Sequence, residues 1–145
     1  SENSNLHSVI SLAGVSDYKS RFPKDEALSK WKEDGVYYIV NGRTKQEMPH
    51  YYQFFEDFIK NEKRLTIKTA AENLKIPHLI IHGDNDTSVS INEAYNLHKW
   101  NLNSKLEIIK DANHVFGSSH PWSEKELPLL LKEASNNILE FILNL

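Results

Sequence analysis

Three short apolar runs, each ended by glycine or aspartate, constrain the fold of this chain more than any other feature. They occupy residues 8–13, 77–82 and 105–110 and are rich in valine, isoleucine and leucine. Such runs are typical of strands in a parallel sheet that is covered on both faces. The third run alternates more between apolar and charged residues, as a strand at a sheet edge does. We therefore expect an α/β fold with about three parallel strands.

Helical patterns lie between and after these runs. Aromatic residues between 51 and 58 recur at helical spacing, and Ser90 with Glu93 forms a capping box before another helix. A long terminal helix follows, which begins either at a cap formed by Ser123 or at Pro128, since proline suits a first helical turn. The alternation of strands and helices in the second half of the chain predicts βαβ units with right-handed crossovers.

The stretch from 17 to 70 breaks this alternation because it is too long for a simple crossover. It contains an apolar run at 36–40 followed by Asn41 and Gly42, which together predict a hairpin with a type I′ turn. At 145 residues the chain has the length of one domain and not of two. We interpret 17–70 as an inserted, lid-like hairpin-plus-helix excursion within a single domain that spans residues 1–145.

Composition excludes several classes of function. The chain has no cysteine, so a disulfide scaffold, a thiolate metal site and a cysteine nucleophile are ruled out. The net charge is −3 and no basic stripe is evident, which argues against a nucleic-acid binder. No stretch approaches the ~20 apolar residues that span a bilayer, so we expect no membrane partner. The missing cysteines and the missing signal core favour a cytoplasmic protein.

The segments that follow the second and third apolar runs carry the candidate chemistry. Residues 82–89 and 111–117 would lie beyond the carboxyl ends of adjacent parallel strands, where ligands bind in open sheets. Asp86 stands in the first segment and His114 in the second. A carboxylate and an imidazole at neighbouring strand ends can act as the orienting acid and the general base of a catalytic triad. Asp84 is the alternative acid.

These two segments resemble the C-terminal half of an α/β-hydrolase, and the closer similarity is to the dienelactone-hydrolase and prolyl-oligopeptidase-like branches. The similarity rests on a strand with the pattern His-Gly-x-x-Asp-x-x-Val, then a helix, a strand and an Asp-x-x-His turn. The resemblance implies a partial α/β-hydrolase fold in which residues 8–16 form the family's sixth strand and 17–70 its variable excursion. It also implies that Asp86 is the triad acid and His114 the triad base.

The nucleophile of that family is missing from the chain. It stands on Gly-x-Ser-x-Gly between a strand and a helix, and no such motif is present. Gly14 and Ser16 follow the first run, but Tyr18 replaces the second glycine, so we interpret Ser16 as a turn residue. The resemblance thus implies the C-terminal portion of a serine-type hydrolase acting on ester or peptide carbonyls (an esterase, lactonase or peptidase). An upstream half would supply the nucleophile, and the chain alone should be inactive.

Two other readings stay open. The chain could be a non-catalytic assembly or binding module built on the same half fold, or a metal-dependent hydrolase that uses His78, His82 and His120. The serine-hydrolase interpretation implies no metal and no organic cofactor. In the resembled fold the strand at 8–13 pairs on both sides, so its open edge should pair with the upstream half or with a second copy of the chain.

Overall fold

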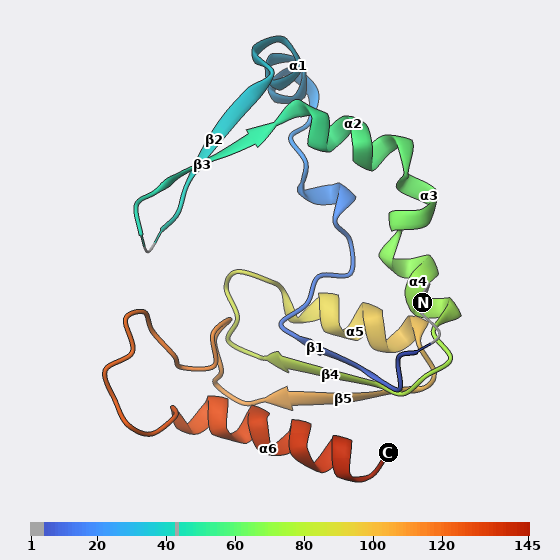
Figure 1. Cartoon of the computed structure of the whole chain (residues 1–145), viewed down its shortest axis with the longest axis vertical. Coiled ribbons are helices and arrows are strands. Elements are labelled where there is room, and N and C mark those ends of the chain that lie inside the picture. The colour runs from blue at the N-terminus through green and yellow to red at the C-terminus, as the bar shows by residue number, and fades with distance from the viewer. Residues whose placement is uncertain (1–4, 43) are drawn as a thin grey trace. The chain divides into compact units, whose positions relative to one another are not determined.

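The computed structural model describes residues 5–42 and 44–145, and these form two compact units. The first unit combines the chain up to Ser16 with Ile67–Leu145, and the second unit is Asp17–Thr66. Figure 1 shows the elements of both units along the chain. The excursion predicted at 17–70 therefore corresponds closely to the second unit, and its membership of a single domain stays a prediction.

A three-stranded parallel sheet forms the centre of the first unit. Its strands are β1 (Val9–Leu12), β4 (His78–Gly83) and β5 (Ser104–Ile109), in the order β1-β4-β5. They are the three strands predicted from the apolar runs, and β5 stands at an edge as its alternation indicated. The central strand β4 is buried along its whole length, which explains the apolar run Leu79–Ile81 at its centre.

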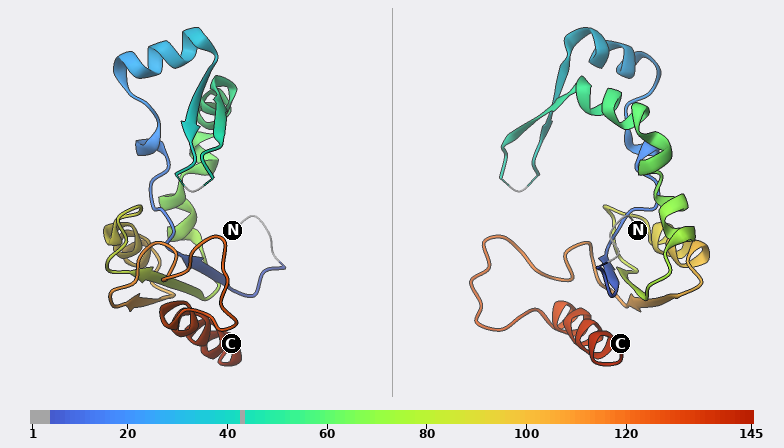
Figure 2. Two further views of the ribbon diagram at one scale, coloured as in Figure 1. Left: turned by 90° about the vertical axis from the view of Figure 1, so that its left-hand side faces the viewer. Right: turned by 45° about the vertical axis from the view of Figure 1, so that its right-hand side comes forward.

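Helices cover both faces of this sheet (Figures 1 and 2). Ile80 of β4 packs with α4 (Ile67–Asn73) and α5 (Ile91–Trp100) on one face. Its neighbours Leu79 and Ile81 pack with α6 (Leu129–Leu143) on the other face. Successive side chains of a strand point to opposite faces, so β4 joins the two apolar cores. No helix in the described part of the chain is both long and apolar enough for a bilayer crossing.

The helix ends show where the local patterns were right. Helix α5 begins where the capping box indicated, because Ser90 Oγ accepts the backbone N–H two residues later at 3.3 Å. The carboxylate of Glu93, however, binds Ser16 on the segment after β1. Helix α6 begins directly after Pro128, which takes the N-cap position, so the alternative start at Ser123 is wrong.

The second unit holds the predicted hairpin and helix around an aromatic core. Strands β2 (Val36–Val40) and β3 (Glu47–Tyr51) pair antiparallel. Helix α1 (Asp25–Asp34) precedes them, and α2 (Tyr52–Lys60) and α3 (Glu62–Leu65) follow. Three aromatic side chains are buried at the centre: Phe22, Trp31 and Phe58.

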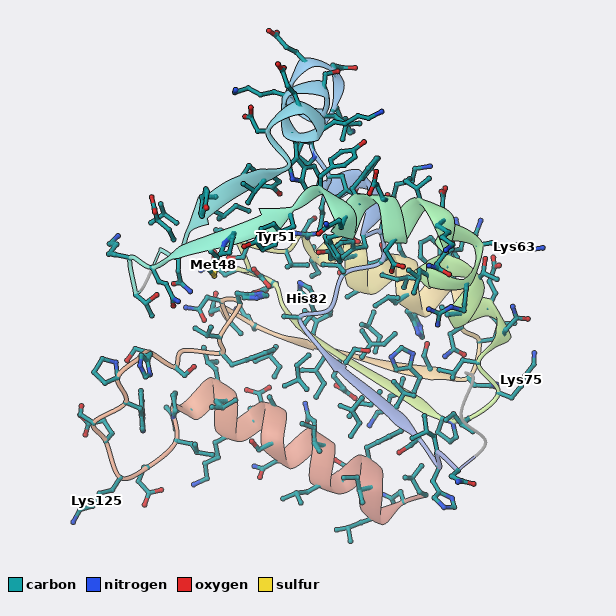
Figure 3. All side chains as sticks on the ribbon, turned by 45° about the horizontal axis from the view of Figure 1, so that its top comes forward. Met48, Tyr51, Lys63, Lys75, His82 and Lys125 are labelled. Atoms are coloured by element: carbon teal, nitrogen blue, oxygen red, sulfur yellow. The ribbon has the colours of Figure 1, made fainter. Side chains whose placement is uncertain are left out.

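Figure 3 shows the side chains of both units. Met48 and Tyr51 stand on β3 of the second unit, and Lys125 stands on the loop before α6 of the first unit.

The connection between β2 and β3 differs from the predicted type I′ turn. The backbone N–H of Asn41 donates to the carbonyl of Gln46 at 2.8 Å, so the strands are joined by a longer loop. A type I′ turn needs a positive φ at both central residues, whereas neither Asn41 nor Gly42 has one. The side chain of Asn41 accepts the backbone N–H of Thr44 at 3.1 Å, which favours this longer loop.

Candidate active site

A close approach between the end of β4 and the segment after β5 fixes the turn that carries Asp86. Strand β4 ends at Gly83, where a Cβ atom would lie 2.1 Å from the carbonyl oxygen of Ala112. Only a residue without a side chain fits this distance. Two residues later, the N–H of Asn85 donates to the same carbonyl at 3.0 Å. The segment after β4 is therefore held against the segment after β5, and both segments stand at the carboxyl ends of their strands.

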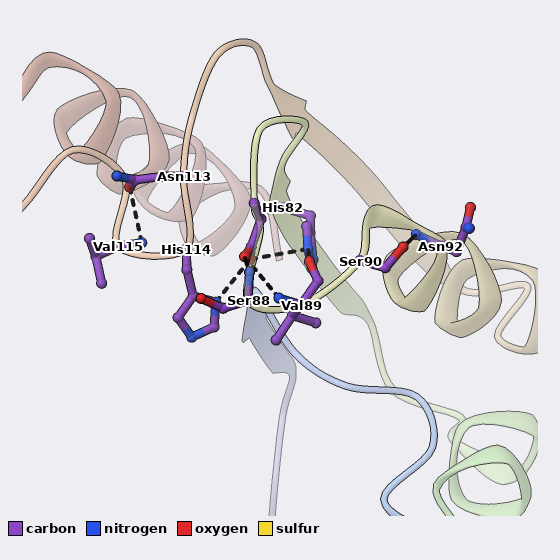
Figure 4. A network of polar contacts seen from close by, with 9 residues as sticks. His82, Ser88, Val89, Ser90, Asn92, Asn113, His114 and Val115 are labelled. Carbon is purple, nitrogen blue, oxygen red and sulfur yellow. Dashed lines mark hydrogen bonds and ion pairs between the residues drawn. The ribbon is translucent and has the colours of Figure 1, made fainter. Parts of the chain in front are cut away.

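The carboxylate of Asp86 is fully buried and has polar contacts at both oxygens (Figure 4). Oδ1 accepts the backbone N–H groups of Ser88 at 2.8 Å and of Val89 at 2.9 Å. Oδ2 lies 2.9 Å from Nδ1 of His114. The same oxygen lies 3.4 Å from Nε2 of His82. The carboxylate is therefore oriented by its own turn and faces two imidazole rings.

These contacts determine the charge of Asp86. Burial of its side chain raises the pKa, but hydrogen bonds from Val89, His114 and Ser88 together lower it by more. The net result is a pKa below the usual value for aspartate. Asp86 is consequently ionised at neutral pH and acts as a hydrogen-bond acceptor for His114.

His114 lies in the loop that follows β5, and 43% of its side chain is exposed. The ionised carboxylate of Asp86 can only accept, so Nδ1 of His114 carries a hydrogen and Nε2 is the nitrogen that can take up a proton. The preceding Asn113 shapes the loop, because its Oδ1 accepts the N–H groups of Val115 at 3.2 Å and Gly117 at 2.9 Å. The two sequence-predicted residues are thus brought together in the orientation of an acid–base pair.

Asp84, the alternative acid, has a different role. Its Oδ1 accepts the backbone N–H of Asp111 at 2.6 Å, and its side chain lies in the exposed part of the turn. Asp111 has a φ of 59°, in the left-handed region, so the carboxylate of Asp84 secures a tight bend after β5. Asp84 therefore joins the two loops, while Asp86 contacts the imidazole.

Ser16 lies outside the Asp86–His114 pair. It is buried, and its hydroxyl donates to the carboxylate of Glu93, which also accepts the N–H of Ser16 at 2.6 Å. Asn96 donates its Nδ2 to the hydroxyl oxygen at 3.2 Å. The Ser16 hydroxyl thus donates its hydrogen bond to a carboxylate on α5. These contacts fit the turn role that the sequence predicted for Ser16.

The remaining candidate histidines do not converge on one point. No group of three or more histidine, aspartate or glutamate side chains within residues 5–42 and 44–145 is placed to hold a metal ion. Nε2 of His78 lies 2.6 Å from Ser11 Oγ, and its Nδ1 lies 3.2 Å from Nδ2 of Asn101. His82 instead faces Asp86, a contact that sequence reasoning missed. Its signal was a histidine in a strand that is buried along its whole length.

Comparison with known proteins finds matches in fold and none in sequence. No family model and no curated protein matches the chain. Est1E from Butyrivibrio proteoclasticus is 16% identical with a TM-score of 0.59, over 96% of this chain and 51% of that one. The monoacylglycerol lipase of Paleococcus ferrophilus is 14% identical with a TM-score of 0.63, over 97% of this chain and 60% of that one.

A third solved structure agrees with these two. The esterase domain of a Rhodothermus marinus protein is 14% identical with a TM-score of 0.50, over 79% of this chain and 45% of that domain. The chain therefore spans about half the length of the structures it matches. At these identities the likeness concerns the fold alone. This chain has a partial α/β-hydrolase fold, as its sequence predicted.

Proposed function

We propose that this chain supplies the acid and the base of a serine-type hydrolase that acts on ester or peptide carbonyls. The observation that carries the proposal is the 2.9 Å contact between Asp86 Oδ2 and His114 Nδ1. It lies at the carboxyl ends of two neighbouring parallel strands, where open α/β sheets bind ligands. The likeness in fold to an esterase domain and to a monoacylglycerol lipase supports an ester or another acyl group as the substrate.

In this proposal each residue has a distinct role. His114 takes the proton of a serine hydroxyl at Nε2 while that oxygen attacks the substrate carbonyl, and it later returns the proton to the leaving group. Asp86 holds the ring with the hydrogen on Nδ1 and stabilises the imidazolium that forms. The depressed pKa of Asp86 keeps this carboxylate ionised throughout the cycle. Each of these steps uses ordinary acid–base chemistry of the two side chains.

The nucleophile comes, in this proposal, from a segment outside the chain. Ser16 is engaged by Glu93, so it does not serve as that serine. Strand β1 offers a place for such a segment, because β4 is its single strand neighbour in the part of the chain that the structure describes. The segment is the upstream half of a longer hydrolase. Without it, the chain should show no turnover above background.

The test compares the isolated chain with the longest natural gene product that contains this sequence. Hydrolysis of a p-nitrophenyl ester and of a peptide amide would be followed, together with labelling by a serine-reactive phosphonate. In the longer protein, Asp86→Asn should lower kcat roughly 10⁴-fold and His114→Ala roughly 10⁶-fold. Asp84→Asn is the matched control, because it changes a carboxylate of the same turn that contacts a backbone N–H rather than His114.

Two results would contradict the proposal. A longer protein that hydrolyses esters equally well after His114→Ala would use other residues. A longer protein that neither hydrolyses these substrates nor reacts with the phosphonate would favour the non-catalytic assembly or binding module.

A further inference from the structure

Next to Asp86 lies a second histidine that the proposed mechanism does not use. His82 stands on β4, one residue before the glycine that ends the strand, and its side chain is fully buried. Its Nε2 lies 2.9 Å from the carbonyl oxygen of Val89 and 3.4 Å from Oδ2 of Asp86. Figure 3 shows His82 within the first unit, and Figure 4 shows its contacts.

The partners of His82 determine where its hydrogen lies. A backbone carbonyl can only accept a hydrogen bond, so Nε2 carries a hydrogen and donates it to Val89. Nδ1 is buried and has no hydrogen-bond partner among the described residues. His82 is thus a donor at Nε2.

The unpaired Nδ1 indicates that His82 is not present for packing alone. Leaving a buried polar atom without a partner lowers stability, and an aliphatic side chain would avoid this loss. The adjacent residues Ile80 and Ile81 show that β4 accepts isoleucine in fully buried positions. The donor at Nε2 is the property that an isoleucine at position 82 would lack.

We propose that His82 is a positioning residue for Asp86, which fixes the turn around the carboxylate by donating Nε2–H to the carbonyl oxygen of Val89. The N–H of Val89 in turn donates to Oδ1 of Asp86, together with that of Ser88. With Oδ1 held by this turn, Oδ2 keeps facing Nδ1 of His114. The inference rests on the proposed function, because orientation matters only if Asp86 serves a catalytic base.

The surroundings of Asp86 make this contribution measurable. The titratable groups that face its carboxylate are His82 from β4 and His114 from the loop after β5. Asp84, on the same turn, directs its Oδ1 to the backbone of Asp111 instead. Loss of the donor at position 82 releases the carbonyl of Val89 and should raise the pKa of Asp86, because burial remains while the backbone hydrogen bond from Val89, which lowers that pKa, is loosened.

The experiment is an NMR titration of the Asp86 carboxyl carbon in the isolated chain, compared between matched variants. In His82→Gln the side-chain amide nitrogen can reach the position of Nε2, whereas in His82→Asn the polar atoms end near Nδ1. We expect the Asp86 titration to move to higher pH in His82→Asn and to stay near that of the wild type in His82→Gln. The amide resonances of Ser88 and Val89 report the two hydrogen bonds to Oδ1, so they should shift in His82→Asn and stay near those of the wild type in His82→Gln.

His82→Leu provides a second test if His82→Asn does not fold. Leucine removes both the donor and the unpaired nitrogen, so it should fold and should show the same upward shift of Asp86. An unshifted titration in His82→Asn and His82→Leu would overturn the proposal, and so would equal shifts in the Gln and Asn variants. Failure of the proposed function would show separately, as missing turnover in the longer protein with the titration result unchanged.

Discussion

His78 Nε2 lies 2.6 Å from Ser11 Oγ, so that side chains of β4 and β1 are joined across the sheet. Nδ2 of Asn101 donates to the other ring nitrogen at 3.2 Å, which leaves the hydrogen of the neutral ring on Nε2. Burial lowers the pKa of His78 from its ordinary value of 6.5. The ring is thus held in its neutral form by its surroundings and by two neutral partners.

We expect the stability of the chain to decrease when the pH falls below about 6.5. Unfolded chains take up a proton on His78 near that pH, whereas folded chains do so only at lower pH, so acid favours unfolding until the folded value is passed. One such group contributes a slope of up to about 1.4 kcal/mol per pH unit. Urea unfolding at pH 7.5 and 5.5 should show this slope reduced in His78→Gln and unchanged in His7→Gln, which alters an exposed histidine. Equal slopes in the wild type and in His78→Gln would contradict the assignment of this pH effect to His78.

Asp86 gives a second pH effect, in a lower window. Its folded pKa lies below the ordinary value of 3.8, so the stability it contributes is present above pH 3.8 and is lost as the pH falls through the folded value. Asp86→Asn should therefore lower the free energy of unfolding by about 1–3 kcal/mol at pH 6. In urea titrations the difference from the wild type should persist at pH 4.5 and shrink at pH 3. A difference that stays constant over this range would show that the ionised carboxylate is not responsible.

The contact of Gly83 with Ala112 predicts a strong effect of a single methyl group. Because a Cβ at Gly83 would lie 2.1 Å from a backbone oxygen, Gly83→Ala has to separate the ends of β4 and β5. We expect a loss of about 3 kcal/mol in the free energy of unfolding, measured in urea. Gly42→Ala is the control, since a Cβ at that position meets no atom within 4 Å. Similar stabilities of the two variants would contradict the close approach.

Ser16 should be a structural residue without reactivity. A serine-reactive phosphonate should not label the isolated chain, because the Ser16 hydroxyl donates to the carboxylate of Glu93. Ser16→Ala should lower the free energy of unfolding by about 1–3 kcal/mol, since Glu93 then loses a donor in a buried place. The exposed Ser29 offers a control in Ser29→Ala, where a small change is expected. Labelling that disappears in Ser16→Ala would make Ser16 the nucleophile.

Local patterns predicted the strands and the meeting of Asp86 with His114, while contacts that no motif encodes could not be predicted. The strand that ends at Gly83 and the turns that carry Asp86 and His114 are each encoded by neighbouring residues. Helix α1 was missed because Trp31 is its one buried residue, so the sequence there shows no periodic apolar face. The contact of Glu93 with Ser16 was missed because it joins residues 77 positions apart.

The open edge of β1 is defined by the direction of its backbone groups. The N–H groups of Val9 and Ala13 donate to carbonyls before and within β4, each at 2.9 Å. Because hydrogen-bonding directions alternate along a strand, the N–H groups of Ile10 and Leu12 point away from β4. β4 is the strand that pairs with β1 in the described residues. An unpaired strand edge with apolar side chains attracts a strand from another chain.

We therefore expect the isolated chain to self-associate through β1. The side chain of Leu12 is 41% exposed, so lysine fits there without disturbing the core, and its charge opposes pairing between two copies of the edge. Analytical ultracentrifugation should show a mass that rises with concentration for the wild type and a monomer for Leu12→Lys. Leu102→Lys makes the same change on a leucine that is 94% exposed and lies beyond the end of α5, and it should associate like the wild type. A wild-type chain that stays monomeric at high concentration, or equal effects of both lysines, would show that this edge is not the site of association.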